Sequence, residues 1–276
     1  MLTAFNIEEH SSGVLRFLHR NRIRVEHRYC DDASLKCVTY EHHRGKIGWN
    51  AVDRFIKAQR NHVLCPPELV LPSDSGYKRF TSTRLSRRMC ENAALYLLRT
   101  AALGGLKVVL IDEAGDSVGL CEWLTDHCEL LTVLTGTTDV YAAQADYLLN
   151  EKGAVIRVCR DTGCLRDADL VIAPAALTHT LPCRSRAMIL TGEKPTSPQN
   201  CTAVYKYFID LPAKYRELCP AFLDEMYFAE ALFVMGGIHA LGSEVFSRCG
   251  DGNVIHTRLS LVRRLKSLIQ ESDASY

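Results

Sequence analysis

A series of short apolar segments between residues 107 and 209 constrains the fold of this chain more than any other feature of the sequence. Residues 107–112 are almost continuously apolar, as is typical of a strand buried on both faces of a parallel sheet. The same pattern predicts five further strands, at 130–135, 154–158, 169–173, 187–191 and 204–209. Between them, residues 118–125 have helical periodicity, and Asp139 can cap a helix that ends near Glu151. Such repeats favour right-handed crossovers and a doubly wound parallel sheet.

The residues before this series are predicted to form a separate, smaller α/β domain. Its strands are expected at 23–27 and 36–40, where apolar residues alternate with period two, and its helices at 14–18, at 51–58 after Asn50 as N-cap, and at 84–103. Gly104-Gly105 ends the last of these helices and marks a boundary. We therefore expect three parts: a small basic α/β domain at 1–103, the doubly wound sheet at 104–212, and a C-terminal helical segment at 213–276 that packs back on the other two.

The C-terminal part is predicted to be helical from Pro220 onward. In a last helix over 254–270, apolar residues recur at spacings of three and four, and Arg263, Arg264 and Lys266 lie largely off that stripe. This pattern favours a helix that docks on the core and exposes a basic face, over a helix that lies on a membrane surface.

Composition places the chain among globular proteins. Of its 276 residues, 47% are hydrophobic and 24% are charged, which is close to the average for folded domains. No apolar run approaches the about 20 residues that a membrane span needs, and the first residues lack the basic and apolar regions of a signal peptide. We expect a cytoplasmic protein with no membrane partner.

The 12 cysteines are scattered along the chain, and none of them forms a Cys-x-x-Cys pair. Zinc sites usually contain such a pair or a closely spaced histidine pair, so no metal site is expected. We interpret the cysteines as reduced and mainly structural thiols, with a reactive thiol as the alternative.

Charge is divided unevenly along the chain. The net charge is +1, yet residues 1–106 contain 17 Lys and Arg against 10 Asp and Glu, and residues 107–276 contain 16 against 22. The basic part could receive an anionic ligand, or the two parts could attract one another. No aromatic residues are interleaved with the basic ones in the way that nucleic-acid surfaces require, so we expect no nucleic-acid partner.

Three segments follow one another in a characteristic order: the strand at 107–112 with its glycine-containing turn and helix, Ala-Asp-Leu-Val-Ile-Ala-Pro at 168–174, and Met-Ile-Leu-Thr-Gly at 188–192. Together they resemble the NAD(P)-binding Rossmann domain of the shikimate dehydrogenase and glutamyl-tRNA reductase type. The small preceding α/β unit and the trailing helices also resemble the arrangement in that superfamily. The resemblance covers roughly residues 104–212. It implies a Rossmann-like sheet, an NAD(P) cofactor bound in an interdomain cleft, and an oxidoreductase activity.

The resemblance also indicates where a cofactor would bind. Open α/β sheets bind ligands beyond the carboxyl ends of their strands, where the strand order reverses. The loops after the first, second and fourth strands of the repeat then supply the candidate cofactor-binding residues Gly115, Asp116, Ser117, Gly119, Thr135, Gly136, Thr137, Ala173 and Pro174. The Lys–Asp motif of shikimate dehydrogenases is not found in the first domain, so the catalytic residues stay unassigned.

The first of these loops departs from the G-x-G-x-x-G pattern. If Gly119 is the third glycine, Ala114 and Asp116 occupy the first two glycine positions, and with Gly115 as the middle one the outer two positions are again not glycine. A carboxylate about 4 Å from a phosphate costs about 4 kcal/mol at an effective dielectric near 20. The second strand is followed by residues 135–137, without the acid that binds the ribose of NAD. The alternative function is therefore a degenerate Rossmann protein without catalysis that acts as a regulatory or protein-interaction module.

Further residues and two other protein classes offer alternative interpretations of the sequence. His179, after the fourth strand, could act as a general acid or base or could simply be an exposed loop residue, and Lys78 with Arg79 could clamp an anion or be solvated. A receiver domain needs an aspartate at the end of the strand at 169–173, and a methyltransferase needs several glycines in the first loop. The expected partner is a small-molecule or nucleotide ligand, and a homo-oligomer is left open.

Overall fold

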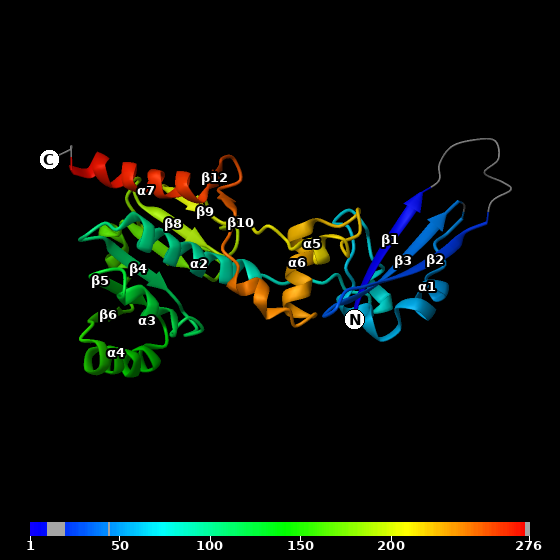
Figure 1. Cartoon of the computed structure of the whole chain (residues 1–276), viewed down its shortest axis with the longest axis horizontal. Coiled ribbons are helices and arrows are strands. Elements are labelled where there is room, and N and C mark those ends of the chain that lie inside the picture. Colours follow the sequence, from blue (N-terminus) through cyan, green and yellow to red (C-terminus); the bar gives the residue numbers. More distant parts are fainter. Residues whose placement is uncertain (10–19, 44, 274–276) are drawn as a thin grey trace. The chain divides into compact units, whose positions relative to one another are not determined.

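The structure is a computed structural model that describes residues 1–9, 20–43 and 45–273 (Figure 1). The chain divides into two units. The first unit contains residues 1–85 and 211–242, and the second contains residues 86–210 and 243–276. The predicted helix at 14–18 lies outside the described residues.

The first unit is built on a sheet of three strands, β1 (Leu2–Glu9), β2 (Arg22–Tyr29) and β3 (Ser34–His42), in the order β1-β3-β2. β3 pairs parallel with β1 and antiparallel with β2. The two strands predicted here are confirmed, whereas β1 was not predicted. Single parallel bridges from Ala4 to Leu64 and from Val63 to Arg79 continue the sheet beyond β1.

Short helices complete the first unit: α1 (Trp49–Ile56), η2 (Lys57–His62), η3 (Ser73–Ser75), α5 (Ala213–Arg216), α6 (Glu225–Val234) and the start of η5 (His239–Ser243). The prediction that Asn50 caps the first of them was wrong, because Gly48 is the N-cap and α1 begins at Trp49. The carboxylate of Asp224 caps α6 by accepting the N–H groups of Met226 and Tyr227. The core between this sheet and its helices contains Phe5, Val38, Tyr40, Val52, Ile56, Val63, Cys65 and Tyr77.

The second unit contains a six-stranded sheet of β4 (Lys107–Ile111), β5 (Leu130–Leu134), β6 (Ile156–Cys159), β7 (Leu170–Ala173), β8 (Met188–Thr191) and β9 (Thr202–Val204). The strands lie in the order β6-β5-β4-β7-β8-β9, and every neighbouring pair is parallel. The prediction of an α/β fold with a doubly wound parallel sheet is confirmed. Numbered within the sheet, this order is 3-2-1-4-5-6, that of the Rossmann fold.

The connections differ between the two halves of this sheet. α3 (Leu120–Thr125) and α4 (Thr138–Lys152) link β4 to β5 and β5 to β6, and η4 (Thr162–Asp167) leads to β7. Residues 174–187, all of them described, reach β8 without a helix. Asp139 was predicted as an N-cap but lies in the first turn of α4, after the N-cap Thr137. Much of one face of the sheet is therefore covered by η4 and loops, in a core formed by Val109, Ile111, Leu134, Leu165, Ala168, Val171, Ala173, Leu177, Cys183, Ala187 and Ile189.

The sixth predicted strand, at 204–209, is corrected by the structure. Residues 202–204 form β9 of the parallel sheet, whereas β10 (Lys206–Phe208) pairs antiparallel with β11 (Arg248–Gly250), which pairs with β12 (Ile255–Thr257). The C-terminal segment is thus not wholly helical. The chain turns between residues 204 and 206, so the apolar run at 204–209 is divided between the six-stranded parallel sheet and the three-stranded antiparallel sheet.

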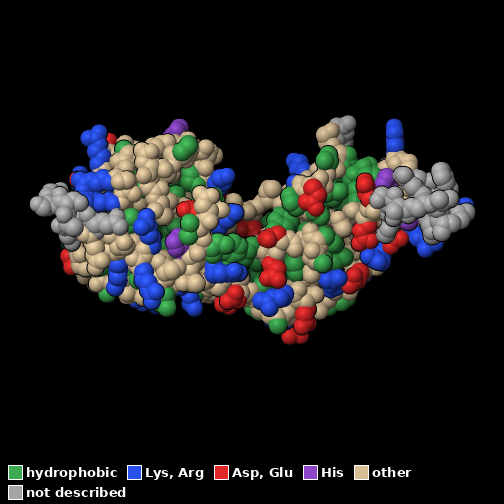
Figure 2. Space-filling model, turned by 90° about the horizontal axis from the view of Figure 1, so that it is seen from above, with side chains coloured by type: hydrophobic (Ala, Val, Ile, Leu, Met, Phe, Trp, Pro, Cys, Tyr) green, Lys and Arg blue, Asp and Glu red, His purple; other side chains and the backbone are tan. Residues whose placement is uncertain are grey.

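Two longer helices belong mainly or wholly to the second unit. α2 (Arg84–Ala101) buries Leu85, Met89, Cys90, Ala93, Ala94, Leu97, Leu98 and Ala101. α7 (Arg258–Asp273) begins later than predicted because residues 255–257 form β12. It buries Leu261, Val262, Leu265 and Leu268 and exposes Arg263 and Arg264, as a core-docking helix does. Lys and Arg side chains accordingly stand out on the face that carries α7 (Figure 2). Among the described residues, no helix is long and apolar enough to cross a membrane.

Candidate active site at the carboxyl edge of the parallel sheet

The strand order of the second unit reverses between β4 and β7. From β4 the chain moves outward to β5 and β6, then returns to β7 and moves the other way to β8 and β9 (Figure 1). The loops after β4 and β7 therefore separate at the carboxyl edge of the sheet, which is where doubly wound sheets bind ligands. This edge is the candidate site.

The loop after β4 is folded around the carboxylate of Asp112, which is 5% exposed. Asp112 Oδ1 accepts the backbone N–H groups of Gly115 and Asp116, each at 3.2 Å, and Oδ2 accepts the N–H of Ser117 at 2.7 Å. Successive N–H groups in such a turn form a site for an anion. In this protein the side-chain carboxylate of Asp112 occupies that site.

A second group stabilises this carboxylate from α4. Tyr141 is fully buried, and its hydroxyl donates to Asp112 Oδ2 at 2.5 Å. Burial and the adjacent carboxylate raise the pKa of Tyr141 well above its ordinary value, so the phenol stays protonated and keeps donating. Asp112 thus joins the loop after β4 to α4.

Gly115 brings the loops after β4 and β5 together. Its φ is +81°, and a Cβ at this position would lie 2.9 Å from Thr137 Oγ1. Thr135 and Thr137 are themselves linked, because their Oγ1 atoms are 3.0 Å apart and Thr135 Oγ1 also accepts the Thr137 N–H. The N–H of Thr135 donates to the carbonyl of Cys159 at 3.1 Å, which joins this loop to the end of β6.

Two side chains of opposite charge lie beside the end of β5. Glu113 leans toward Gly136: its Oε2 is 3.2 Å from the position that a Cβ of Gly136 would occupy. Arg160, directly after β6, donates from Nη2 to Thr138 Oγ1 at 2.8 Å. A carboxylate such as that of Glu113 can accept hydrogen bonds from ribose hydroxyls, and a guanidinium such as that of Arg160 can pair with a phosphate. Both side chains lie at the same end of the sheet.

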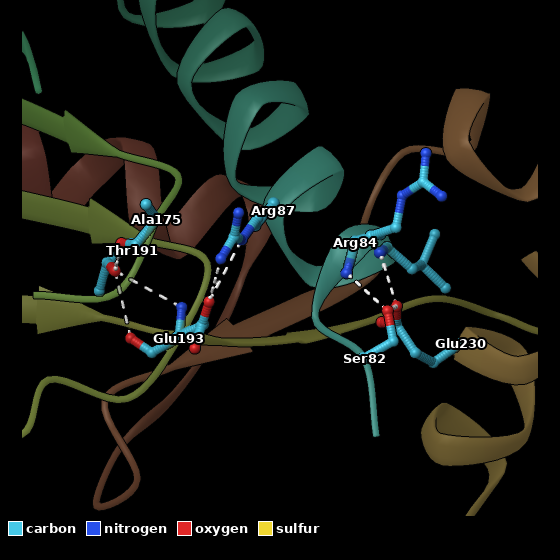
Figure 3. A network of polar contacts seen from close by, with 8 residues as sticks. Ser82, Arg84, Arg87, Ala175, Thr191, Glu193 and Glu230 are labelled. Carbon is cyan, nitrogen blue, oxygen red and sulfur yellow. Dashed lines mark hydrogen bonds and ion pairs between the residues drawn. The ribbon is translucent and has the colours of Figure 1, made fainter. Parts of the chain in front are cut away.

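The loops after β7 and β8 are packed tightly against α2. Gly192 donates its N–H to the carbonyl of Ala173 at 3.3 Å, and a Cβ on Gly192 would lie 2.3 Å from the Pro174 oxygen and 2.8 Å from Arg87 Cα. Arg87 pairs with Glu193 Oε1 at 2.8 Å (Figure 3). This packing leaves room only for glycine at 192.

Polar side chains of α2 belong to the site although the sequence did not indicate them. Glu91 Oε1 accepts from Ser117 Oγ at 3.3 Å, and its other oxygen pairs with Arg88 at 2.8 Å. α2 precedes β4 in the chain, and the only signal for these residues in the sequence was the spacing of 87, 88 and 91 on one helical turn.

Thr191, at the end of β8, is fully buried. Its Oγ1 lies within hydrogen-bond distance of the carbonyls of Ala175 and Glu193 (Figure 3).

The structure places the predicted site residues in three locations. Gly115, Asp116, Ser117, Thr135, Gly136 and Thr137 lie in the two joined loops after β4 and β5, whereas Ala173 and Pro174 are buried beside Gly192. Gly119 is exposed at the N-cap of α3 and has open space around its Cβ position.

The remaining candidates are placed elsewhere. His179 is exposed in the loop between β7 and β8. In the first unit, Arg79 Nη2 donates to the carbonyls of Pro66, Pro67 and Leu69 at 2.7–2.9 Å. Arg79 therefore holds the proline loop through these three carbonyls.

Among the described residues, no three or more His, Cys, Asp or Glu side chains lie close enough together to hold a metal ion. The twelve cysteines are free thiols.

Comparison with known proteins adds two distant likenesses. No family model matches the chain, and no curated protein matches it. A solved structure of Thermococcus litoralis Δ1-pyrroline-2-carboxylate reductase with NADH and L-proline is similar at a TM-score of 0.27 and 14% identity, over 43% of this chain and 39% of that one. The crystal structure of L-tryptophan dehydrogenase from Nostoc punctiforme is similar at a TM-score of 0.27 and 14% identity, over 87% and 77%. The strand order, and not these likenesses, shows that the second unit is a Rossmann-like domain.

Proposed function

We propose that the second unit binds an NAD(P)-type dinucleotide at the carboxyl edge of its parallel sheet, as part of an oxidoreductase. The observation that carries the proposal is the strand order 3-2-1-4-5-6 with its reversal between β4 and β7. That arrangement separates two loops at one edge and leaves a crevice in which dinucleotides bind. The nicotinamide would supply the hydride chemistry, and the chain's own residues would hold and orient it.

The residues after β4 fit a dinucleotide only in part. The N–H groups of residues 115–117 already bond to Asp112, so a pyrophosphate cannot use them without displacing that carboxylate. Gly119 is the position where a phosphate could approach the backbone closely, because nothing lies within 4 Å of its Cβ position. Asp116 is exposed, so water screens its charge.

The residues around the end of β5 fit the adenosine end better. No carboxylate follows β5 directly, and Arg160 is anchored on Thr138 at the start of α4. A guanidinium here can pair with the 2′-phosphate that distinguishes NADP from NAD. We therefore expect NADPH to bind more tightly than NADH.

Isothermal titration of the folded, reduced protein with NADPH and NADH tests this proposal. Arg160→Ala should weaken NADPH binding about tenfold or more, because a hydrogen bond to a charged group contributes about 1.5–3 kcal/mol, and should leave NADH binding nearly unchanged. Arg166→Ala is the matched control, since Arg166 is an exposed arginine on η4. An equal loss for both dinucleotides would show that Arg160 does not read the 2′-phosphate.

A second candidate function is a regulatory or protein-interaction module without catalysis. It is favoured by the Asp112 carboxylate, which takes the three N–H groups that a phosphate would otherwise accept. The same titration separates the two functions. If the folded protein binds neither dinucleotide, the first proposal is wrong and the sheet serves as a scaffold.

A further inference from the structure

Two cysteines of the second unit lie side by side. Cys159 is the last residue of β6 and Cys164 lies in η4, and their Sγ atoms are 3.3 Å apart. A disulfide bond is about 2.05 Å long, so the two sulfurs need to approach by little more than one ångström to bond. Side-chain rotation can supply much of a movement of this size.

The local fold keeps the two thiols together. Asp161 is the N-cap of η4, and its carboxylate accepts the N–H of Gly163 at 3.0 Å. This cap turns the chain back immediately after β6, and Cys159 Sγ also lies 3.8 Å from the Asp161 carbonyl oxygen. The thiol contact is therefore a consequence of the turn between β6 and η4.

Both thiols can be reached by a small molecule. Cys159 and Cys164 are half-buried and line one cavity of about 330 Å³ together with Lys107 and Arg157. Most other cysteines lack this access, because Cys37, Cys65, Cys90, Cys121, Cys183 and Cys249 are buried. Cys183 also contacts Cys201, but Cys183 is only 8% exposed.

The two thiols are not equivalent. Burial and the neighbouring Cys159 thiol raise the pKa of Cys164, which makes Cys164 a poor first nucleophile at neutral pH. Cys159 is then the thiol that attacks first, and Cys164 is placed to attack next.

We propose that Cys159 and Cys164 form a reversible intrachain disulfide by exchange with a small disulfide of the oxidised-glutathione class. The Cys159 thiolate attacks one sulfur of the oxidant, forms a mixed disulfide and releases one glutathione thiol. Cys164, on losing its proton, attacks Cys159 Sγ and releases the second glutathione thiol. The chain loses two electrons and two protons, and the oxidant gains both.

This modification site goes beyond dinucleotide binding and does not depend on it. The disulfide would close a loop that contains Arg160 and Asp161, and the Cys159 carbonyl accepts the Thr135 N–H at the end of β5. Oxidation would therefore fix the turn that carries Arg160. The chemistry can be tested on the full chain without any nucleotide.

The test is thiol mapping of the full chain after equilibration with reduced and oxidised glutathione. Free thiols are alkylated, the protein is digested, and linked peptides are identified by mass spectrometry. We expect a Cys159–Cys164 link in the wild type that dithiothreitol reverses. Cys164→Ser should instead keep a glutathione adduct on Cys159, because no second thiol resolves it.

Cys201→Ser is the matched control, since it removes a thiol from the other cysteine contact and should leave the Cys159–Cys164 link intact. Circular dichroism of each variant checks that it is folded. Two results would overturn the proposal: no Cys159–Cys164 link in the folded wild type, or a glutathione adduct that persists on wild-type Cys159 as it does in Cys164→Ser.

Discussion

The hydroxyl of Tyr141 donates to Asp112 Oδ2 at 2.5 Å, and both side chains are buried. This contact joins α4, which follows β5, to the loop that follows β4. The same carboxylate accepts three loop N–H groups. One buried anion therefore organises the carboxyl edge of the sheet before any ligand binds.

Tyr141→Phe should lower the free energy of unfolding by about 1.5–3 kcal/mol, because it leaves a buried carboxylate with one donor fewer. Urea unfolding of the wild type and the variant measures the change. Tyr147→Phe is the control, since Tyr147 lies on the same helix with 46% of its surface exposed and should change stability by less than about 0.5 kcal/mol. Equal effects of the two variants would show that the Asp112 contact contributes nothing specific.

Gly115→Ala should destabilise the site, whereas Gly119→Ala should not. Alanine at 115 must adopt a φ of +81° and place Cβ 2.9 Å from Thr137 Oγ1, so we expect a loss of about 1–3 kcal/mol. Gly119 has a φ of −63° and nothing within 4 Å of its Cβ position. Thermal unfolding of both variants checks this. A Gly119 variant as unstable as the Gly115 variant would show that the positive φ of Gly115 and its contact with Thr137 are not the cause of the loss.

Glu230→Gln should weaken the start of α2. Glu230 is 6% exposed, and its Oε1 accepts the Ser82 hydroxyl at 2.7 Å and the Leu85 N–H at 3.0 Å (Figure 3). The amide keeps the shape but loses the charge that favours a helix N-terminus, so we expect a loss of about 1 kcal/mol in denaturant unfolding. Glu244→Gln is an exposed control. No difference between the two variants would show that the charge of Glu230 is not needed.

Asp32 should titrate in an unusually acidic range. Hydrogen bonds from Tyr215, at 2.6 Å, and Lys214, at 2.9 Å, lower the pKa of Asp32 from 3.8 to about 2. Because the folded-state pKa is depressed, the stabilising contribution is complete above about pH 4 and is lost as the pH falls toward 2. Tyr215→Phe should move the Asp32 pKa upward in a carboxyl NMR titration. An unchanged Asp32 pKa in that variant would show that the phenol is not the cause.

The parallel sheet was predictable because its strands are buried on both faces. Residues 107–112, 130–135 and 187–191 are mainly apolar, as is typical of inner strands of a parallel sheet, and their length of five or six residues fits strands better than helices. β1 was not predicted because its first four residues are buried while the next three are half-buried. This burial corresponds neither to a continuous apolar run nor to a regular alternation of apolar and polar residues. The run at 204–209 misled because a bend after Val204, which periodicity cannot show, divides it between two sheets.

The sequence by itself determined the α/β class, the positions of most strands and the acidic character of the loop after β4, because these depend on local pattern and residue type. Only the tertiary structure decided what that acidic loop does. Asp112 turns inward to the backbone amides of residues 115–117 and to Tyr141, while Glu113 and Asp116 are exposed. The contact of Cys159 with Cys164 and the place of α2 beside Ser117 were likewise decided by packing. Such contacts depend on how chain segments pack in three dimensions. The direction in which a carboxylate points is set by hydrogen-bond donors that come together only on folding, such as the Tyr141 hydroxyl for Asp112.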